Sequence, residues 1–193
     1  MKSLLPRTAL LLAAALVAAP LFAADAPPAP AAARPNSTGG NSPHETTSAT
    51  LGRGGPRVTV TYGRPYAKGR KVWGQLVPWN QPWRLGSDEA TTFLTQQPLT
   101  IGDKTLAAGI YTLYLVPSEN EATKLAFSSA LGGWGIPVVT NADVARFDLK
   151  KETLPAAVEQ LTLAVKPDAA TGGGTLTIAW ETTQFSLPFT VKK

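Results

Sequence analysis

The sequence predicts an all-β fold: a single-domain β-sandwich or jelly-roll-like domain, mostly antiparallel, with about 8–10 strands and little helix. Apolar and polar residues alternate with a period of two from Leu51 onward, which indicates strands with one buried face. Turn-forming residues separate these segments at short intervals. No stretch of ten or more residues carries a sustained helical stripe, so helix is expected at most as a turn or two.

The first half of the domain offers three clear segments. Residues 58–62 alternate apolar and threonine side chains, as in a half-buried strand. Gly102-Asp103 separates 99–101 from 104–106 and predicts a two-residue hairpin turn. Residues 110–116 are apolar on both faces, which is typical of a strand covered on both sides.

The second half predicts further strands and one short helical segment. Residues 145–149 alternate again, and near the C-terminus 161–165, 175–181 and 184–191 predict three consecutive antiparallel strands. Pro188 places the last of them at an edge or a bulge, because proline cannot donate to the ladder. Thr153 to Glu159 is the one segment expected to form a turn or two of helix, with Pro155 near its start.

The N-terminus has the layout of a secretory signal peptide, predicted over residues 1–24. Lys2 and Arg7 precede the uncharged apolar stretch 8–24, which ends in small residues. As a membrane anchor the stretch falls short of the roughly 20 apolar residues that a spanning helix needs, and Pro20 interrupts it. The sequence therefore predicts a periplasmic or secreted protein without stable membrane insertion after cleavage of the signal.

A flexible linker is predicted over residues 25–48, and the β-sandwich domain over 49–193. The linker is rich in Ala, Pro, Ser, Thr, Gly and Asn and has almost no large apolar residue. Such a composition cannot offset the entropy lost when a chain becomes ordered.

Composition excludes several classes of function. The chain has no cysteine, so it has no disulfide, no thiolate nucleophile and no thiolate metal site. The formal charge is +5, and it falls to +3 without Lys2 and Arg7. The one dense basic run, Arg64 with 68–71, is interpreted as a solvated loop or a contact for anions, since an exported protein is not expected to meet nucleic acid.

The residues offer little for catalysis. His44 is the single histidine, and it falls in the predicted linker, where an imidazole would not be held as a catalytic triad requires. We therefore predict no catalytic residue, no metal site and no cofactor. Carboxylate-dependent glycoside hydrolysis would need Glu89 together with Asp88 or Glu181. Asp88 and Glu89 are adjacent, and on a strand they would face opposite sides.

Tryptophan and arginine gather in one stretch of the chain. Trp73, Trp79 and Trp83 fall within eleven residues, with Arg64 and Arg84 nearby. Aromatic rings stack on sugars or guanidinium groups, and arginine binds carboxylates and phosphates, so the stretch is typical of a binding surface. The alternative is a long loop pinned to the sandwich by its own aromatic residues, with Arg84 paired to Glu89.

Several motifs together resemble one bacterial family. They are Ser42-Pro43-His44-Glu45, 58–65 (VTVTYGRP), 68–76 (KGRKVWGQL), 83–91 (WRLGSDEAT) and 108–115 (AGIYTLYL). The chain resembles the family catalogued as domain of unknown function 2911 over about 150 residues. This resemblance implies an exported β-rich protein and brings no established activity.

The leading hypothesis is a binding module for a saccharide, a peptide or an anionic envelope component. The predicted ligand-binding residues are His44, Tyr62, Arg64, Trp73, Trp83, Arg84 and Glu89. Trp73 and Trp83 would stack, Arg64 and Arg84 would make charge-assisted bonds, and Glu89 would orient Arg84. The alternatives are the carboxylate hydrolase and a structural or partner-binding envelope domain.

Overall fold

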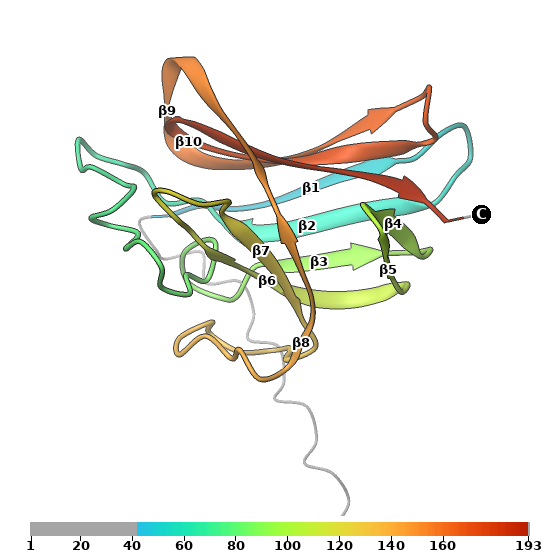
Figure 1. Cartoon of the computed structure of the whole chain (residues 1–193), viewed down its shortest axis with the longest axis horizontal. Coiled ribbons are helices and arrows are strands. Elements are labelled where there is room, and N and C mark those ends of the chain that lie inside the picture. Colours follow the sequence, from blue (N-terminus) through green and yellow to red (C-terminus); the bar gives the residue numbers. More distant parts are fainter. Residues whose placement is uncertain (1–41, 193) are drawn as a thin grey trace, which may run out of the picture.

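The computed structural model describes residues 42–192. These residues form ten strands and no helix. The strands are β1 (His44–Thr50), β2 (Arg57–Gly63), β3 (Thr92–Thr95), β4 (Leu99–Ile101), β5 (Lys104–Leu106), β6 (Gly109–Val116), β7 (Lys124–Ser128), β8 (Asp143–Asp148), β9 (Lys150–Asp168) and β10 (Gly173–Val191). They form two antiparallel sheets, ordered β1-β2-β3-β6-β7-β8 and β5-β4-β10-β9. Figure 1 shows the long β9–β10 hairpin lying across the larger sheet. The predicted all-β sandwich and its strand number are confirmed.

Strand β1 corrects the predicted boundary between linker and domain. It pairs with β2 from His44 opposite Gly63 to Thr50 opposite Arg57, so residues 44–48 belong to the sandwich. Only Ala49 of this strand is buried, and the strand therefore lacks the apolar alternation that marks β2. Its threonines suit a sheet edge, and Thr46 hydrogen-bonds Thr61 across the pair at 2.9 Å. The predicted signal peptide and the linker up to residue 41 lie outside the described residues.

The predicted hairpin at Gly102-Asp103 is confirmed. Ile101 pairs with Lys104, and Gly102 has a positive φ of 59°, which glycine adopts without steric cost. Strands β2 and β8 also form where the alternation predicted them, and β6 forms where the continuous apolar segment predicted a strand, within a few residues at each end.

The C-terminal region contains two long strands where three short ones were predicted. Residues 175–181 and 184–191 are parts of the single strand β10, which bends at register shifts around Glu181. Glu181 has a φ of 51°, a turn-like conformation that breaks the alternation without ending the strand. Pro188 lies between the ladder to β9, which ends at Ser186, and the ladder to β4, which begins at Thr190.

The predicted helical turn at Thr153–Glu159 is wrong. This segment lies in β9, where Thr153 pairs with Thr183 and Val158 pairs with Glu181 of β10. Pairing with a strand distant in sequence overrides the weak local preference for a helical turn.

The core lies between the two sheets and is built from the inward residue of each alternating pair. Val58, Val60 and Tyr62 from β2 face Leu161 and Leu163 of β9. A second part of the core centres on Phe127, whose ring meets Phe93, Tyr111 and Phe147 edge to face with centroids 5.2–6.0 Å apart. Apolar burial supplies the stability of a domain that has no disulfide.

The long connection between β2 and β3, residues 64–91, projects from one end of the sandwich. Ala67 N donates to Glu159 O at 2.8 Å and Leu161 N donates to Pro65 O at 2.9 Å, so the start of the connection pairs with β9. Farther along, Trp83 and Leu115 exchange backbone hydrogen bonds of 2.7 and 2.8 Å. These links fix the connection against both sheets. Within residues 42–192, no helix is long and apolar enough to cross a membrane.

Candidate functional site

A groove of about 740 Å³ opens between the β2–β3 connection and the loop after β7. Its lining consists of Ser42, Pro65, Tyr66, Lys68, Arg70, Leu76, Pro82, Trp83, Arg84, Gly86, Ser87, Ile136, Pro137, Val138 and Trp180. Three of these side chains are cationic, three are aromatic, and no carboxylate is among them. Concave sites with a few convergent polar groups and aromatic walls are typical of ligand binding.

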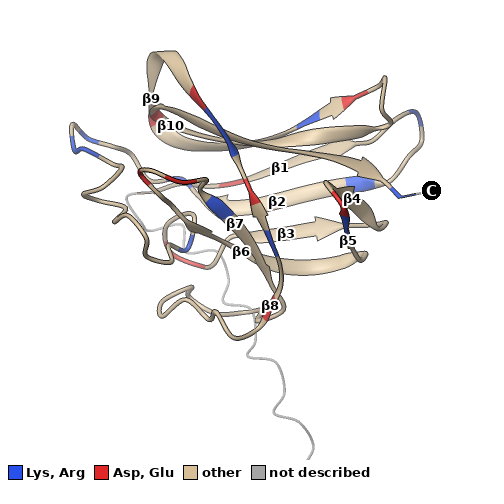
Figure 2. Ribbon diagram, viewed as in Figure 1, with Lys and Arg blue, Asp and Glu red and all other residues tan. Residues whose placement is uncertain are grey.

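Two of the three cations of the groove, Arg70 and Arg84, are held by backbone carbonyls rather than by acids. Arg84 donates through Nη1 to Asp88 O at 2.8 Å and to Trp134 O at 3.1 Å, and through Nε to Gly86 O at 3.2 Å. Arg70 donates to Tyr66 O and Ala67 O at 2.7 and 2.9 Å. No ion pair to Lys68, Arg70 or Arg84 exists among residues 42–192. Figure 2 shows basic residues at the tip of the projecting connection.

Arg84 is a partly desolvated cation. Desolvation by burial lowers the pKa of its guanidinium, and the nearby carboxylates of Asp88 and Glu89 oppose this shift without reversing it. Its Nη2 has no hydrogen-bond partner within the described residues. Arg84 therefore presents a free donor and an incompletely balanced charge where the groove begins.

Trp83 lines the groove, and other aromatic rings pack against it. Its ring stacks on Trp180 with centroids 5.7 Å apart and planes at 22°, and it meets Trp73 edge to face at 6.3 Å. Trp180 and Trp73 are buried, and each ring N–H is bonded to a backbone carbonyl. A supported ring of this kind loses little conformational entropy when a ligand stacks on it.

Two of the predicted ligand-binding residues are buried in the core. Tyr62 is 1% exposed and Trp73 is 5% exposed, so neither offers a ring face to a ligand in this structure. Trp73 also stacks with Trp79 and contacts Phe185 edge to face. Both side chains contact core residues, which agrees with the alternative interpretation of a loop that its own aromatic residues hold against the sandwich.

Arg64 is likewise committed to structure. Its Nε donates to Leu161 O at 3.1 Å, its Nη2 donates to Thr162 Oγ1 at 3.0 Å, and its Nη1 pairs with Glu45. This guanidinium joins β1 and β9 at the end of β2. It does not line the groove.

His44 and Glu89 form a pair that the sequence did not predict. His44 Nε2 lies 2.8 Å from Glu89 Oε2, and the side chains are 11% and 19% exposed. The contact is close but lacks the alignment of a hydrogen bond, and Ser87 Oγ and Asp88 Oδ2 beside it are also buried without partners. The expected Arg84–Glu89 ion pair is absent among residues 42–192, so that part of the prediction is wrong.

The three carboxylates of the hydrolase alternative, Asp88, Glu89 and Glu181, do not line the groove. Glu181 accepts a hydrogen bond from Val72 N at 2.9 Å, which fixes the connection to the bend in β10. Asp88, with a φ of 61°, and Glu89 sit behind the groove rather than in its lining. No group of three or more acidic or histidine side chains within residues 42–192 could hold a metal ion.

Sequence analysis missed several groove residues. Lys68 and Arg70 were noted only as part of a basic run, and the absence of nearby acids in 64–72 was the signal for them. Trp180 and the Ile136–Val138 wall carried no such signal, because they reach the groove from a core strand and from a distant loop.

Comparison with known proteins gives one result. The family model described as "Protein of unknown function (DUF2911)" matches residues 42–189. No curated protein and no solved structure matches the chain. The matched range begins two residues before β1 and ends within β10, so it spans nearly all of the sandwich. The chain therefore belongs to the DUF2911 family of proteins of unknown function.

Proposed function

We propose that this protein is a binding module for an extended anionic ligand, in the first place an acidic saccharide of the cell envelope. The observation that carries the proposal is the set of three cations, Lys68, Arg70 and Arg84, which line one groove without a carboxylate partner in the described chain. Arg84 is partly desolvated, while Lys68 and Arg70 are exposed in the same groove. An incoming anion would restore the charge balance that burial removed at Arg84 and would make charge-assisted bonds to all three cations.

The aromatic wall favours a ligand that carries rings. Trp83 and Tyr66 line the same groove as the cations. Sugar rings stack on such flat side chains, while acidic substituents would reach Lys68 and Arg70. A location in the periplasm or outside the cell, as the predicted signal peptide indicates, would bring the protein to ligands of this kind.

The hydrolase alternative has less support. Glycoside hydrolysis requires two carboxyl groups that flank the bond to be cleaved. Glu181 is engaged by Val72 N and Glu89 by His44, and neither lines the groove. A binding role requires no such pair.

Calorimetry with oligogalacturonate, and with an uncharged glucan oligosaccharide of equal length, tests the proposal. Lys68→Gln and Arg70→Gln should each weaken binding of the acidic oligosaccharide about tenfold or more, because a hydrogen bond to a charged group contributes about 1.5–3 kcal/mol. Arg53→Gln is the matched control, since Arg53 is exposed in the β1–β2 turn and lies outside the groove. Equal binding of the charged and uncharged oligosaccharides, or equal losses in all three variants, would contradict the proposal.

Arg84 is less suited to this test than Lys68 and Arg70. One of its three hydrogen bonds to backbone carbonyls, to Trp134 O, links the connection to the loop after β7, and the other two, to Gly86 O and Asp88 O, lie within the connection. Arg84→Ala should lower stability as well as affinity, because the carbonyls of Gly86, Asp88 and Trp134 lose their donor. The affinity of the Arg84→Ala protein must therefore be measured together with its unfolding curve, so that a loss of binding can be separated from a loss of folded protein.

A further inference from the structure

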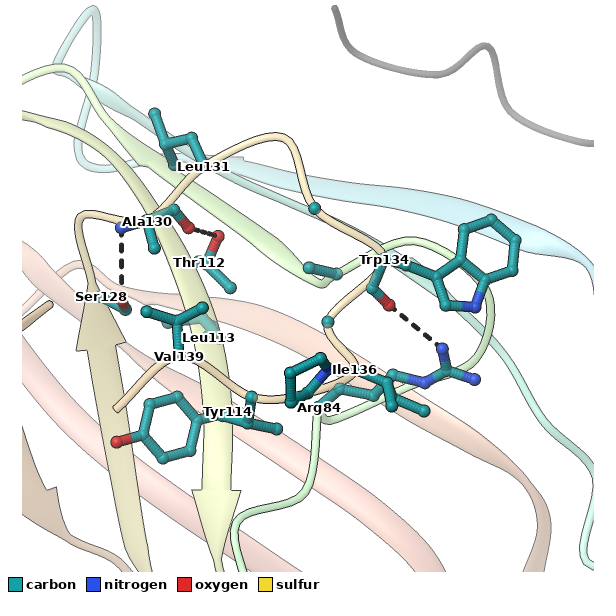
Figure 3. Close-up of a pocket in the computed structure, with 15 residues that line it drawn as sticks. Arg84, Thr112, Leu113, Tyr114, Ser128, Ala130, Leu131, Trp134, Ile136 and Val139 are labelled. Atoms are coloured by element: carbon teal, nitrogen blue, oxygen red, sulfur yellow. Dashed lines mark hydrogen bonds between the residues drawn. The ribbon is translucent and has the colours of Figure 1, made fainter. Parts of the chain in front are cut away.

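A second and smaller pocket adjoins the groove, and its chemistry is different. It has a volume of about 140 Å³ and lies under the loop between β7 and β8, where residues 130–139 cover β6 (Figure 3). Its walls are mostly apolar: Ala90, Leu113, Ala130, Leu131, Ile136, Pro137, Val138 and Val139, with Trp134 and Tyr114. The pocket and the groove share Arg84 and the wall Ile136–Val138.

The hydroxyl side chains around this pocket are already bonded to protein. Thr112 Oγ1 donates to Ala130 O at 2.6 Å, and Ser128 Oγ accepts from Ala130 N at 3.2 Å (Figure 3). Tyr114 Oη donates to Asp143 Oδ2 at 2.6 Å. Arg84 Nη2 has no partner among the described residues. An occupant would therefore meet an apolar interior with a cation at its border.

The loop is anchored, so the pocket is preformed. Ala90 N donates to Gly133 O at 3.2 Å, and Arg84 Nη1 donates to Trp134 O at 3.1 Å. The guanidinium of Arg84 also lies 6.0 Å from the centre of the Trp134 ring. An ideal Cβ on Gly135 would come within 2.9 Å of Arg84 Cβ, so the loop backbone packs directly on the arginine stem. A preformed apolar pocket binds without a large ordering cost.

From this geometry we propose that the pocket takes a compact apolar group, of about six carbons, that belongs to the same ligand whose anionic part contacts Arg84. This inference rests on the proposed function and names the chemical class more closely: an anion with a small hydrophobic substituent. The volume decides the size, since an apolar cavity of about 150 Å³ holds one benzene molecule. Arg84 lines both the apolar pocket and the cationic groove, so an apolar group in the pocket and an anionic group at Arg84 can belong to one ligand.

A series of straight-chain carboxylates tests the proposal in the full-length protein. Affinities of acetate, butyrate, hexanoate and decanoate are measured by NMR titration, with the methyl signals of Leu113 and Val139 assigned. Hexanoate should bind about tenfold or more tightly than acetate, because each buried methylene adds severalfold to affinity. Decanoate should gain little over hexanoate, since the pocket is then full. The two methyl signals should shift with hexanoate and not with acetate.

Variants place the bound group. Ala130→Phe fills the pocket and should remove the advantage of hexanoate over acetate. Val144→Phe adds the same ring at a position 52% exposed and outside the pocket, and it should leave the advantage intact. The wild-type chain-length series stands on its own if Ala130→Phe fails to fold.

The opposing outcomes are distinct. An affinity that keeps rising from hexanoate to decanoate would place the chain on the open surface and overturn the pocket assignment. Equal affinities for acetate and hexanoate, together with binding of oligogalacturonate in the groove, would overturn this inference and leave the proposed function standing. Failure of every anion to bind would overturn both.

Discussion

At the scale of single residues, one tyrosine and one arginine at the C-terminal end of β2, Tyr62 and Arg64, link the two sheets. Tyr62 Oη accepts from Leu163 N at 2.9 Å and donates to Leu163 O at 3.3 Å, so one buried hydroxyl satisfies both backbone polar groups of Leu163 in β9. Burial of the hydroxyl raises the pKa of Tyr62, mainly through desolvation. Arg64, next to it in space, bonds Leu161 O and Thr162 Oγ1 of the same strand. The linkage explains why these residues are unavailable to a ligand.

Tyr62→Phe should lower the free energy of unfolding by roughly 1–3 kcal/mol, because it leaves a buried N–H and a buried C=O of Leu163 without their partner. Urea denaturation monitored by tryptophan fluorescence measures the loss. Tyr66→Phe, at a half-buried groove position, should change stability little. Equal stability of Tyr62→Phe and the wild type would mean that the hydroxyl does not link the sheets.

Tyr114 makes stability sensitive to alkaline pH. Desolvation, followed by its hydrogen bond to Asp143, raises its pKa from 10.0 to about 12. A pKa raised in the folded state favours the neutral phenol there, so this contribution is complete below about pH 10 and is lost as the pH rises toward about 12. The thermal midpoint should therefore fall over that range, and Tyr114→Phe should show a smaller fall. An identical pH dependence in both proteins would exclude Tyr114 as the cause.

At the scale of elements, the junction between β2 and the segment 83–91 allows no added side-chain volume. An ideal Cβ on Gly63 would lie 2.1 Å from Ser87 O, a contact that real structures do not tolerate. Gly63 also stands opposite His44 in the β1–β2 ladder. Close approach at this point brings His44 toward Glu89 and sets Gly86 and Ser87 along the groove.

Gly63→Ala should destabilise the domain by about 1–3 kcal/mol or more, because the Ser87 backbone must move to admit the methyl group. It should also weaken anion binding in the groove, since the displaced segment carries Arg84. Unfolding curves and the oligogalacturonate titration measure the two effects. Gly133→Ala is the control for stability, because its nearest atom would be the Gly135 amide nitrogen at 3.7 Å. A Gly63→Ala protein with unchanged stability and affinity would contradict this account of the junction.

At the scale of the whole molecule, the sandwich has a dry core and one end that carries both cavities. The cationic groove and the apolar pocket lie at the end where the β2–β3 connection meets the loop after β7, and Trp180 of β10 also lines the groove. Exposed apolar residues Leu131, Trp134, Ile136 and Val139 belong to that same loop. Such clustering on one surface is typical of interaction sites.

Salt should weaken the proposed binding. Raising ionic strength from about 10 mM to about 150 mM shortens the Debye length from about 30 Å to about 8 Å, which screens exposed Lys68 and Arg70 from an anionic ligand. Oligogalacturonate affinity should fall severalfold over this range, while the affinity gain of hexanoate over acetate should persist because apolar burial is little affected by screening. Salt-independent binding of the acidic oligosaccharide would contradict the role of these cations.

The sequence by itself determined the fold class, the hairpin at Gly102-Asp103, the family and the concentration of tryptophan and arginine in one connection. These features follow from local rules, because alternation and turn chemistry act between near neighbours in the chain. Tertiary structure alone decided that His44 is paired with Glu89, that Trp73 is buried while Trp83 lines the groove, and that Trp180 supports it from β10. The His44–Glu89 and Trp83–Trp180 contacts join residues that are distant in sequence. The difference between Trp73 and Trp83 depends on which face of the connection is covered. Local alternation carries no information about such contacts, so only the arrangement of the two sheets and their loops determines which residues line the candidate site.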